Sequence, residues 1–100
     1  MLKHIVMFKL IEEAEGSGKA DNALKIKSLL EELPSKINDI IGYEVGINII
    51  QSDRAMDMVI VSSFEDKDGL MRYINHPEHL KAVDFVNKRR SESRVVDFEI

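Results

Sequence analysis

Residues 3–11 read KHIVMFKLI, and this stretch decides the fold because it is apolar on both faces of the strand that it predicts. Its apolar side chains divide between the two faces as Val6, Phe8 and Leu10 against Ile5, Met7 and Ile11. Successive strand residues point to opposite faces of a sheet. A strand that is apolar on both faces therefore belongs in the middle of a sheet whose two sides are both covered.

Three further strands are predicted, over Tyr43–Ile50, Met56–Phe64 and Arg94–Ile100. The segment Met56–Phe64 is also apolar on both faces, whereas the other two alternate apolar with polar residues. One-sided strands suit the edges of a sheet and two-sided strands suit its centre. Numbered along the chain, the four strands should therefore lie in the spatial order 4-1-3-2.

The helices complete the topology. After a polar loop at Glu12–Lys19, apolar residues recur at helical spacing, with Asp21 or Asn22 as the expected N-cap, and Pro34 should end or kink this helix. Asp66 is expected to cap a short helix that ends near Asn75, and Pro77 suits the first turn of another that runs to about Arg90. The order β-α-β-β-α-α-β predicts an α+β, ferredoxin-like protomer with a four-stranded antiparallel sheet.

The 100 residues are expected to form a single domain, 1–100. Helices from one chain can cover only one face of such a sheet, and the other apolar face also needs cover. A second copy of the chain is the simplest cover, so we expect a homodimer joined through the sheet faces that carry Ile5 and Met7.

Composition narrows the class of protein. With 18 acidic and 14 basic side chains the formal net charge is −4, which argues against a nucleic-acid partner. The basic cluster Lys88-Arg89-Arg90 falls near a predicted helix end, where cations suit the helix dipole. Cysteine is absent, so disulfides, thiolate nucleophiles and cysteine-bound zinc are excluded. No signal peptide or apolar run of about 20 residues is present, so we expect a cytoplasmic protein without a membrane partner.

The segment Tyr73–His79 reads YINHPEH and brings together the side chains most suited to proton transfer. His79 falls in the first turn of its helix on an inward stripe, where partial burial and the positive helix end both favour a neutral ring. A neutral imidazole beside a dry pocket can act as a general base; the alternative is a buried histidine bonded to the backbone. Tyr73 also points inward, either to donate to a substrate carbonyl or to bond to the backbone.

The other two histidines have simpler interpretations. His76 precedes Pro77 and is expected to be the helix N-cap. His4 lies on an apolar strand face, as a core residue or as a third member of the site, and Asp97 is the nearest candidate to orient it because the first and last strands are neighbours. The histidines do not form a metal-ligand cluster, and phosphate loops and nucleophile elbows are absent, so neither a metal nor a cofactor is predicted.

These residues resemble the stress-responsive A/B barrel (Dabb) family over nearly the whole chain. The matching segments, in order, are His4–Leu10, Glu44–Gly46, Phe64, Tyr73–His79 and Val95–Phe98. The resemblance implies ferredoxin-like protomers that pair through their sheets into a dimeric α+β barrel. It also allows a magnesium ion near the end of the first helix, held by main-chain carbonyls.

The resemblance also implies a chemistry. A plant member, olivetolic acid cyclase, closes a linear polyketide by an intramolecular aldol reaction; its general base corresponds to His79, its supporting tyrosine to Tyr73 and a strand-one pocket histidine to His4. One interpretation is therefore a cofactor-independent, cyclase-like lyase, or a binder, for a small apolar or polyketide-like carbonyl compound. A second is a non-catalytic, stress-related structural dimer, and a third is a cofactor-free monooxygenase.

Overall fold

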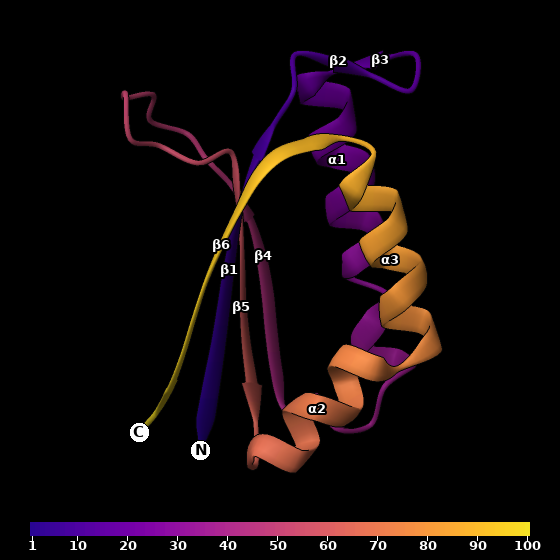
Figure 1. Ribbon diagram of the computed structural model, residues 1–100, viewed down its shortest axis with the longest axis vertical. Helices are drawn as coiled ribbons and strands as arrows, with labels where there is room; N and C mark the ends of the chain where they lie inside the picture. Colours follow the sequence, from indigo (N-terminus) through magenta and orange to yellow (C-terminus); the bar gives the residue numbers. More distant parts are fainter.

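The computed structural model describes residues 1–100, which form four long strands, a small hairpin and three α-helices (Figure 1). In chain order the elements are β1 (Leu2–Leu10), β2 (Glu13–Ala14), β3 (Ser17–Gly18), α1 (Lys19–Leu30), the 3₁₀ turn η1 (Leu33–Ser35), β4 (Gly42–Ile47), β5 (Met58–Phe64), α2 (Lys67–Asn75), α3 (Pro77–Asn87) and β6 (Arg90–Glu99). None of the helices is both long enough and apolar enough to cross a membrane.

The four long strands form one antiparallel sheet in the order β4-β5-β1-β6. This order confirms the 4-1-3-2 arrangement predicted from the two-sided strands. All three helices lie on one side of the sheet, and the β4–β5 loop leans out on the opposite side (Figure 1). The fold is the predicted α+β, ferredoxin-like one.

Strand register assigns each apolar side chain to a face. Met7 pairs with Val59, and Ile5 pairs with both Val61 and Val96, so these residues share the face that carries no helix. Val96 is 52% exposed there. The opposite, helix-covered face holds a single core of buried side chains: Leu2, Phe8, Leu10, Ala23, Ile26, Leu30, Leu33, Ile37, Val45, Met58, Ile60, Phe64, Leu70, Tyr73, Ala82 and Val86.

The first helix begins earlier than predicted, at Lys19 with Gly18 as its N-cap, so neither Asp21 nor Asn22 caps it. The expected loop contains the β2–β3 hairpin, whose turn includes Gly16 at φ 81°, a backbone conformation that glycine adopts without strain. Asn22 is buried instead, and its Nδ2 donates to the carbonyls of Ala14 and Ser17 at 3.1 and 3.2 Å. The side chain of Asn22 therefore binds the hairpin and does not cap α1.

Other boundaries also differ from the prediction. β6 begins at Arg90 rather than Arg94, because its pairing with β1 continues through a register shift to Leu10 opposite Arg90. α3 consequently ends at Asn87. β4 ends at Ile47, and Ile49, which was expected in that strand, is 90% exposed in the loop. α1 ends at Leu30, and Pro34 lies in η1.

Candidate active site

A pocket of about 250 Å³ lies between the sheet and the helices. Most of its lining is apolar and comes from β1, β5, β6, α1 and α3. His4, Tyr73 and His79, the three residues singled out from the sequence, all line it. The fold therefore brings His4, from the first strand, into one pocket with Tyr73 and His79.

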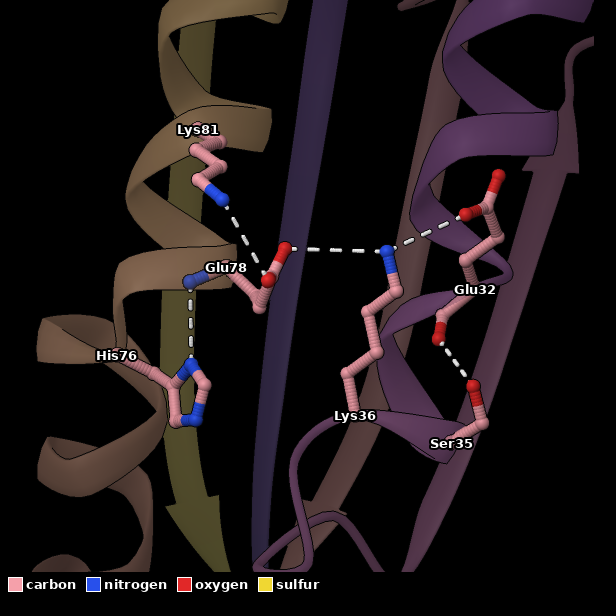
Figure 2. Close-up of polar contacts among 6 residues, drawn as sticks. All are labelled: Glu32, Ser35, Lys36, His76, Glu78 and Lys81. Carbon is pink, nitrogen blue, oxygen red and sulfur yellow. Dashed lines mark hydrogen bonds and ion pairs between the residues drawn. The ribbon is translucent and has the colours of Figure 1, made fainter.

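The first turn of α3 positions His79. Pro77 occupies the start of the helix, and the Nδ1 atom of His76 accepts a hydrogen bond from the backbone N–H of Glu78 at 3.1 Å (Figure 2). This contact confirms His76 as the N-cap. A side-chain acceptor at this position satisfies a helix N–H that would otherwise lack a partner.

Ion pairs on the outer surface link the same turn to the residues that flank η1. The Glu78 carboxylate lies 3.8 Å from Lys36 Nζ and 3.5 Å from Lys81 Nζ, and Lys36 also pairs with Glu32 at 3.4 Å (Figure 2). Such exposed pairs contribute little stability. Their consequence for the site is that Glu78 is held by the lysines rather than folded back onto His79.

The ring of His79 is held in one tautomer. Its Nδ1 lies 2.9 Å from the carbonyl oxygen of Ile74, which can only accept a hydrogen bond, so Nδ1 carries the proton. Nε2 has no partner within the chain, and because no buried polar side-chain atom is left unpaired, Nε2 lies within reach of solvent. Burial lowers the pKa of His79 below 6.5, with smaller contributions from His4 and His76, and the bond to Ile74 opposes the shift. The direction agrees with the prediction from burial, and a pKa below 6.5 favours the neutral ring at pH 7.

Tyr73 packs directly on His79, with 4.3 Å between the ring centroids. Tyr73 is 1% exposed, and its hydroxyl lies 3.0 Å from that of Tyr43 on β4. Burial raises the pKa of Tyr73, partly offset by this hydrogen bond, and burial together with Tyr73 raises the pKa of Tyr43. Both phenols therefore stay protonated, and their mutual hydrogen bond uses only one of the two protons.

His4 lies at the centre of the sheet, opposite Asp97 in the β1–β6 register. Its Nδ1 is hydrogen-bonded to the Asp97 carboxylate, which confirms the orienting residue expected from the neighbouring strands. A carboxylate can only accept, so Nδ1 is the donor, and the ring presents Nε2 on its other side. The His4 ring meets the Tyr73 ring edge-on at 6.2 Å.

The prediction that Lys88-Arg89-Arg90 lies near a helix end is confirmed for Lys88, the C-cap of α3, and for Arg89, which donates to the Phe85 carbonyl at 2.9 Å, whereas Arg90 already belongs to β6. Arg89 is buried; its Nε donates to Asn22 Oδ1 at 3.2 Å, and its guanidinium stacks on Phe85 at 3.5 Å. Arg90 lines the pocket. Because β6 begins earlier than expected, both residues lie where the chain turns back onto the sheet, and of the three only Lys88 is exposed.

Sequence reasoning also missed Tyr43 as a partner of the site. The one-sided pattern of its strand places Tyr43 on the inner face, which is the signal that could have found it. Metal ligation has no comparable signal, because nowhere do three or more histidine, aspartate or glutamate side chains gather as metal ligands would.

Comparison with known proteins agrees with this fold. A sequence model of the stress responsive A/B barrel domain matches residues 2–100. An uncharacterized protein of Streptomyces coelicolor is 33% identical over 84 residues, which cover 83% of this chain and 84% of that protein.

Two solved structures show the range of relatives. A dimeric protein of unknown function from Bacteroides fragilis, with a ferredoxin-like fold, is 31% identical with a TM-score of 0.86, over 99% of this chain and 95% of its own. The hydroxynitrile lyase of Passiflora edulis is 14% identical with a TM-score of 0.79, over 99% and 92% of the two chains. At that identity the likeness concerns the fold alone.

Proposed function

The chain belongs to the stress responsive A/B barrel domain family, and we propose that it is an enzyme of general acid–base type that acts on a small, largely apolar carbonyl compound. In this proposal His79 removes a proton from the carbon next to the carbonyl. The fold is known to carry an enzyme, since the Passiflora edulis protein is a hydroxynitrile lyase.

One observation carries the proposal: the Nδ1–H of His79 is committed to the Ile74 carbonyl, while its Nε2 is free beside an apolar pocket. The lowered pKa keeps this nitrogen unprotonated at pH 7. A general base must be deprotonated and within hydrogen-bond reach of the proton that it abstracts. His79 meets the first condition and is placed to meet the second.

The neighbouring groups suit the rest of the step. When the C–H proton moves to His79 Nε2, the electron pair of that bond passes to the carbonyl oxygen, which becomes an enolate. The spare phenol proton of the Tyr43–Tyr73 pair can donate to this oxygen through Tyr73, which lines the pocket. His4, oriented by Asp97, is the second imidazole available to give or take a proton as the enolate reacts.

The size of the pocket limits the substrate. About 250 Å³ exceeds the ~150 Å³ cavity that holds benzene and falls below the usual range for drug-sized ligands. A single ring or a short chain with one carbonyl suits this volume better than an extended polyketide does.

We further propose that the working unit is a homodimer joined through the helix-free sheet face. That face carries Ile5, Met7 and Val59 at its centre, and it would otherwise expose them to water. The β4–β5 loop leans out on the same side and exposes Ile50 by 73%, which offers further apolar contact to a second copy (Figure 1). The Bacteroides fragilis relative is a dimer.

The alternative function is that of a non-catalytic, stress-related dimer. One observation favours it: every buried polar side-chain atom already has a partner within the chain, as a purely structural core requires. In that case His79 would serve only to bond Ile74, and replacing it would affect stability but no reaction.

An exchange experiment separates the two functions. The α-protons of phenylacetone are followed by NMR in D₂O with the wild-type protein, with His79→Ala and with His76→Asn. The last variant removes the neighbouring imidazole but keeps a good N-cap. We expect the wild type and His76→Asn to accelerate exchange and His79→Ala to lose about 10²–10⁴ of that rate. Equal exchange rates with wild type and His79→Ala would support the structural function instead.

A further inference from the structure

Arg90 is a cation that lines the apolar pocket without an acidic partner. Its Nε donates to Asn87 Oδ1 at 2.9 Å, but no carboxylate lies within ion-pair distance of its guanidinium. By contrast, Arg94 on the same strand pairs with Glu92 at 3.3 Å.

Strand register places Arg90 on the pocket side and away from the histidines. Arg90 lies opposite Leu10, which is buried on the helix-covered face. Ser93 lies opposite Phe8, whereas Asp97 lies opposite His4. Between His4 and Phe8 a strand advances by about 13 Å, so the pocket has an acid–base end at His4 and a cationic end beyond Phe8.

Asn87 and Ser93, which line the pocket together with Arg90, both leave donors free. Asn87 Oδ1 accepts a hydrogen bond from the Arg90 Nε–H and thereby orients the guanidinium. The remaining N–H groups of Arg90 have no acceptor within the chain. The Ser93 hydroxyl, which also lines the pocket, makes no hydrogen bond within the chain. A planar guanidinium and a hydroxyl that line the same end of a pocket are suited to the two oxygens of a carboxylate.

We propose that Arg90 and Ser93 bind the carboxylate of the natural ligand, which is a narrow, apolar carboxylic acid with its reactive carbonyl at the His79 end. About 250 Å³ distributed along this length suits an unbranched chain or one ring on a short chain. The inference deepens the proposed function by naming the substrate class, a medium-chain keto acid. It shares the pocket with that function, but the binding of the carboxylate does not require His79 to be a base.

The test compares octanoate with octanamide by isothermal titration calorimetry on the full chain. The two probes have the same carbon chain and differ in the charge that Arg90 is proposed to bind. We expect the wild-type protein to bind octanoate about tenfold more tightly than octanamide. Arg90→Gln should abolish this preference and leave octanamide affinity unchanged, whereas Arg90→Lys should retain part of it.

A matched control variant removes a different positive charge close to Arg90. Lys88 lies two residues from Arg90 and is exposed, so Lys88→Gln should keep the tenfold preference for octanoate. His79→Ala should keep it too, which separates the carboxylate site from the proposed chemistry.

Equal wild-type affinities for the two probes, an undiminished preference in Arg90→Gln, or a failure of the wild type to bind octanoate would each overturn the assignment. Of these, the first two would leave the proposed role of His79 intact.

Discussion

His4 on β1 and Asp97 on β6 face each other across neighbouring strands, and their side chains are joined by a hydrogen bond between Nδ1 and the carboxylate. His4 is buried, whereas the Asp97 side chain is 43% exposed at the sheet edge. The pair therefore fixes the orientation of the His4 ring through Nδ1 and leaves Nε2 without a partner within the chain.

Asp97→Asn should destabilise the protein modestly. A hydrogen bond to a charged group contributes about 1.5–3 kcal/mol when buried, and the exposure of Asp97 reduces this to about 1 kcal/mol. For a domain of this size the expected fall in Tm is about 4–8 °C, measured by thermal unfolding. Asp84→Asn is the matched control on exposed α3 surface and should leave Tm nearly unchanged. Equal Tm values for Asp97→Asn and wild type would show that the pair does not contribute to folding.

Tyr73→Phe and Tyr43→Phe remove the same hydrogen bond from opposite ends. Each variant leaves the other hydroxyl without its partner, so each should lose about 1–3 kcal/mol in the free energy of unfolding, measured by urea denaturation. Activity should differ, because only the Tyr73 ring packs on His79. We expect Tyr73→Phe to lower the exchange rate more than Tyr43→Phe does, but less than His79→Ala does. The reverse order of the two tyrosine variants would assign the donor role to Tyr43.

The stability of the protein should depend on the protonation of His79. Its pKa in the folded protein is lowered by burial, so the unfolded chain takes up the proton more readily. The stability from the neutral ring is fully present above the unfolded pKa of about 6.5 and is lost as pH falls from there through the folded pKa. Urea denaturation at pH 7.5 and 5 should show a smaller loss for His79→Gln than for wild type. An NMR titration that placed the His79 pKa above 6.5 would refute the sign of this effect.

Charges on the helix-free sheet face should disrupt the proposed dimer. Light scattering of the wild type should report twice the 11.4 kDa chain mass, whereas Met7→Asp should report a monomer or insoluble protein. Val96→Asp changes an edge-strand residue that is already half exposed, so it should fold and still weaken association. Leu24→Asp, on the outer side of α1, should remain dimeric. A monomeric wild type at micromolar concentration would rule the dimer out.

The strand order was predictable because the pattern of apolar and polar residues along a strand shows which of its faces are buried. Two segments, Lys3–Ile11 and Met56–Phe64, are apolar on both faces. They therefore had to lie at the centre of the sheet, and this set the order of all four strands. The β2–β3 hairpin was not predictable, since strands of two residues show no periodicity. It was this hairpin that engaged Asn22 and shifted the start of α1.

The site was predictable where it depended on spacing within one helix or on neighbouring strands, and not where it depended on the packing of a strand against a helix. Helical spacing alone turned Tyr73 and His79 inward. The Tyr43–Tyr73 bond joins a strand to a helix, and a pattern within either element cannot set that distance. Arg90 was assigned to a helix end because the early start of β6 depends on a shift in its register with β1.

The pH dependence of α-proton exchange tests the central claim most directly. If His79 is the base, kcat/KM should rise with pH through the His79 pKa, which lies below 6.5, and stay level above it. The midpoint should match the NMR titration of the same ring, and this step should vanish in His79→Ala. A wild-type profile that is flat across this range, or a step that persists in His79→Ala, would contradict the role of His79 as the general base.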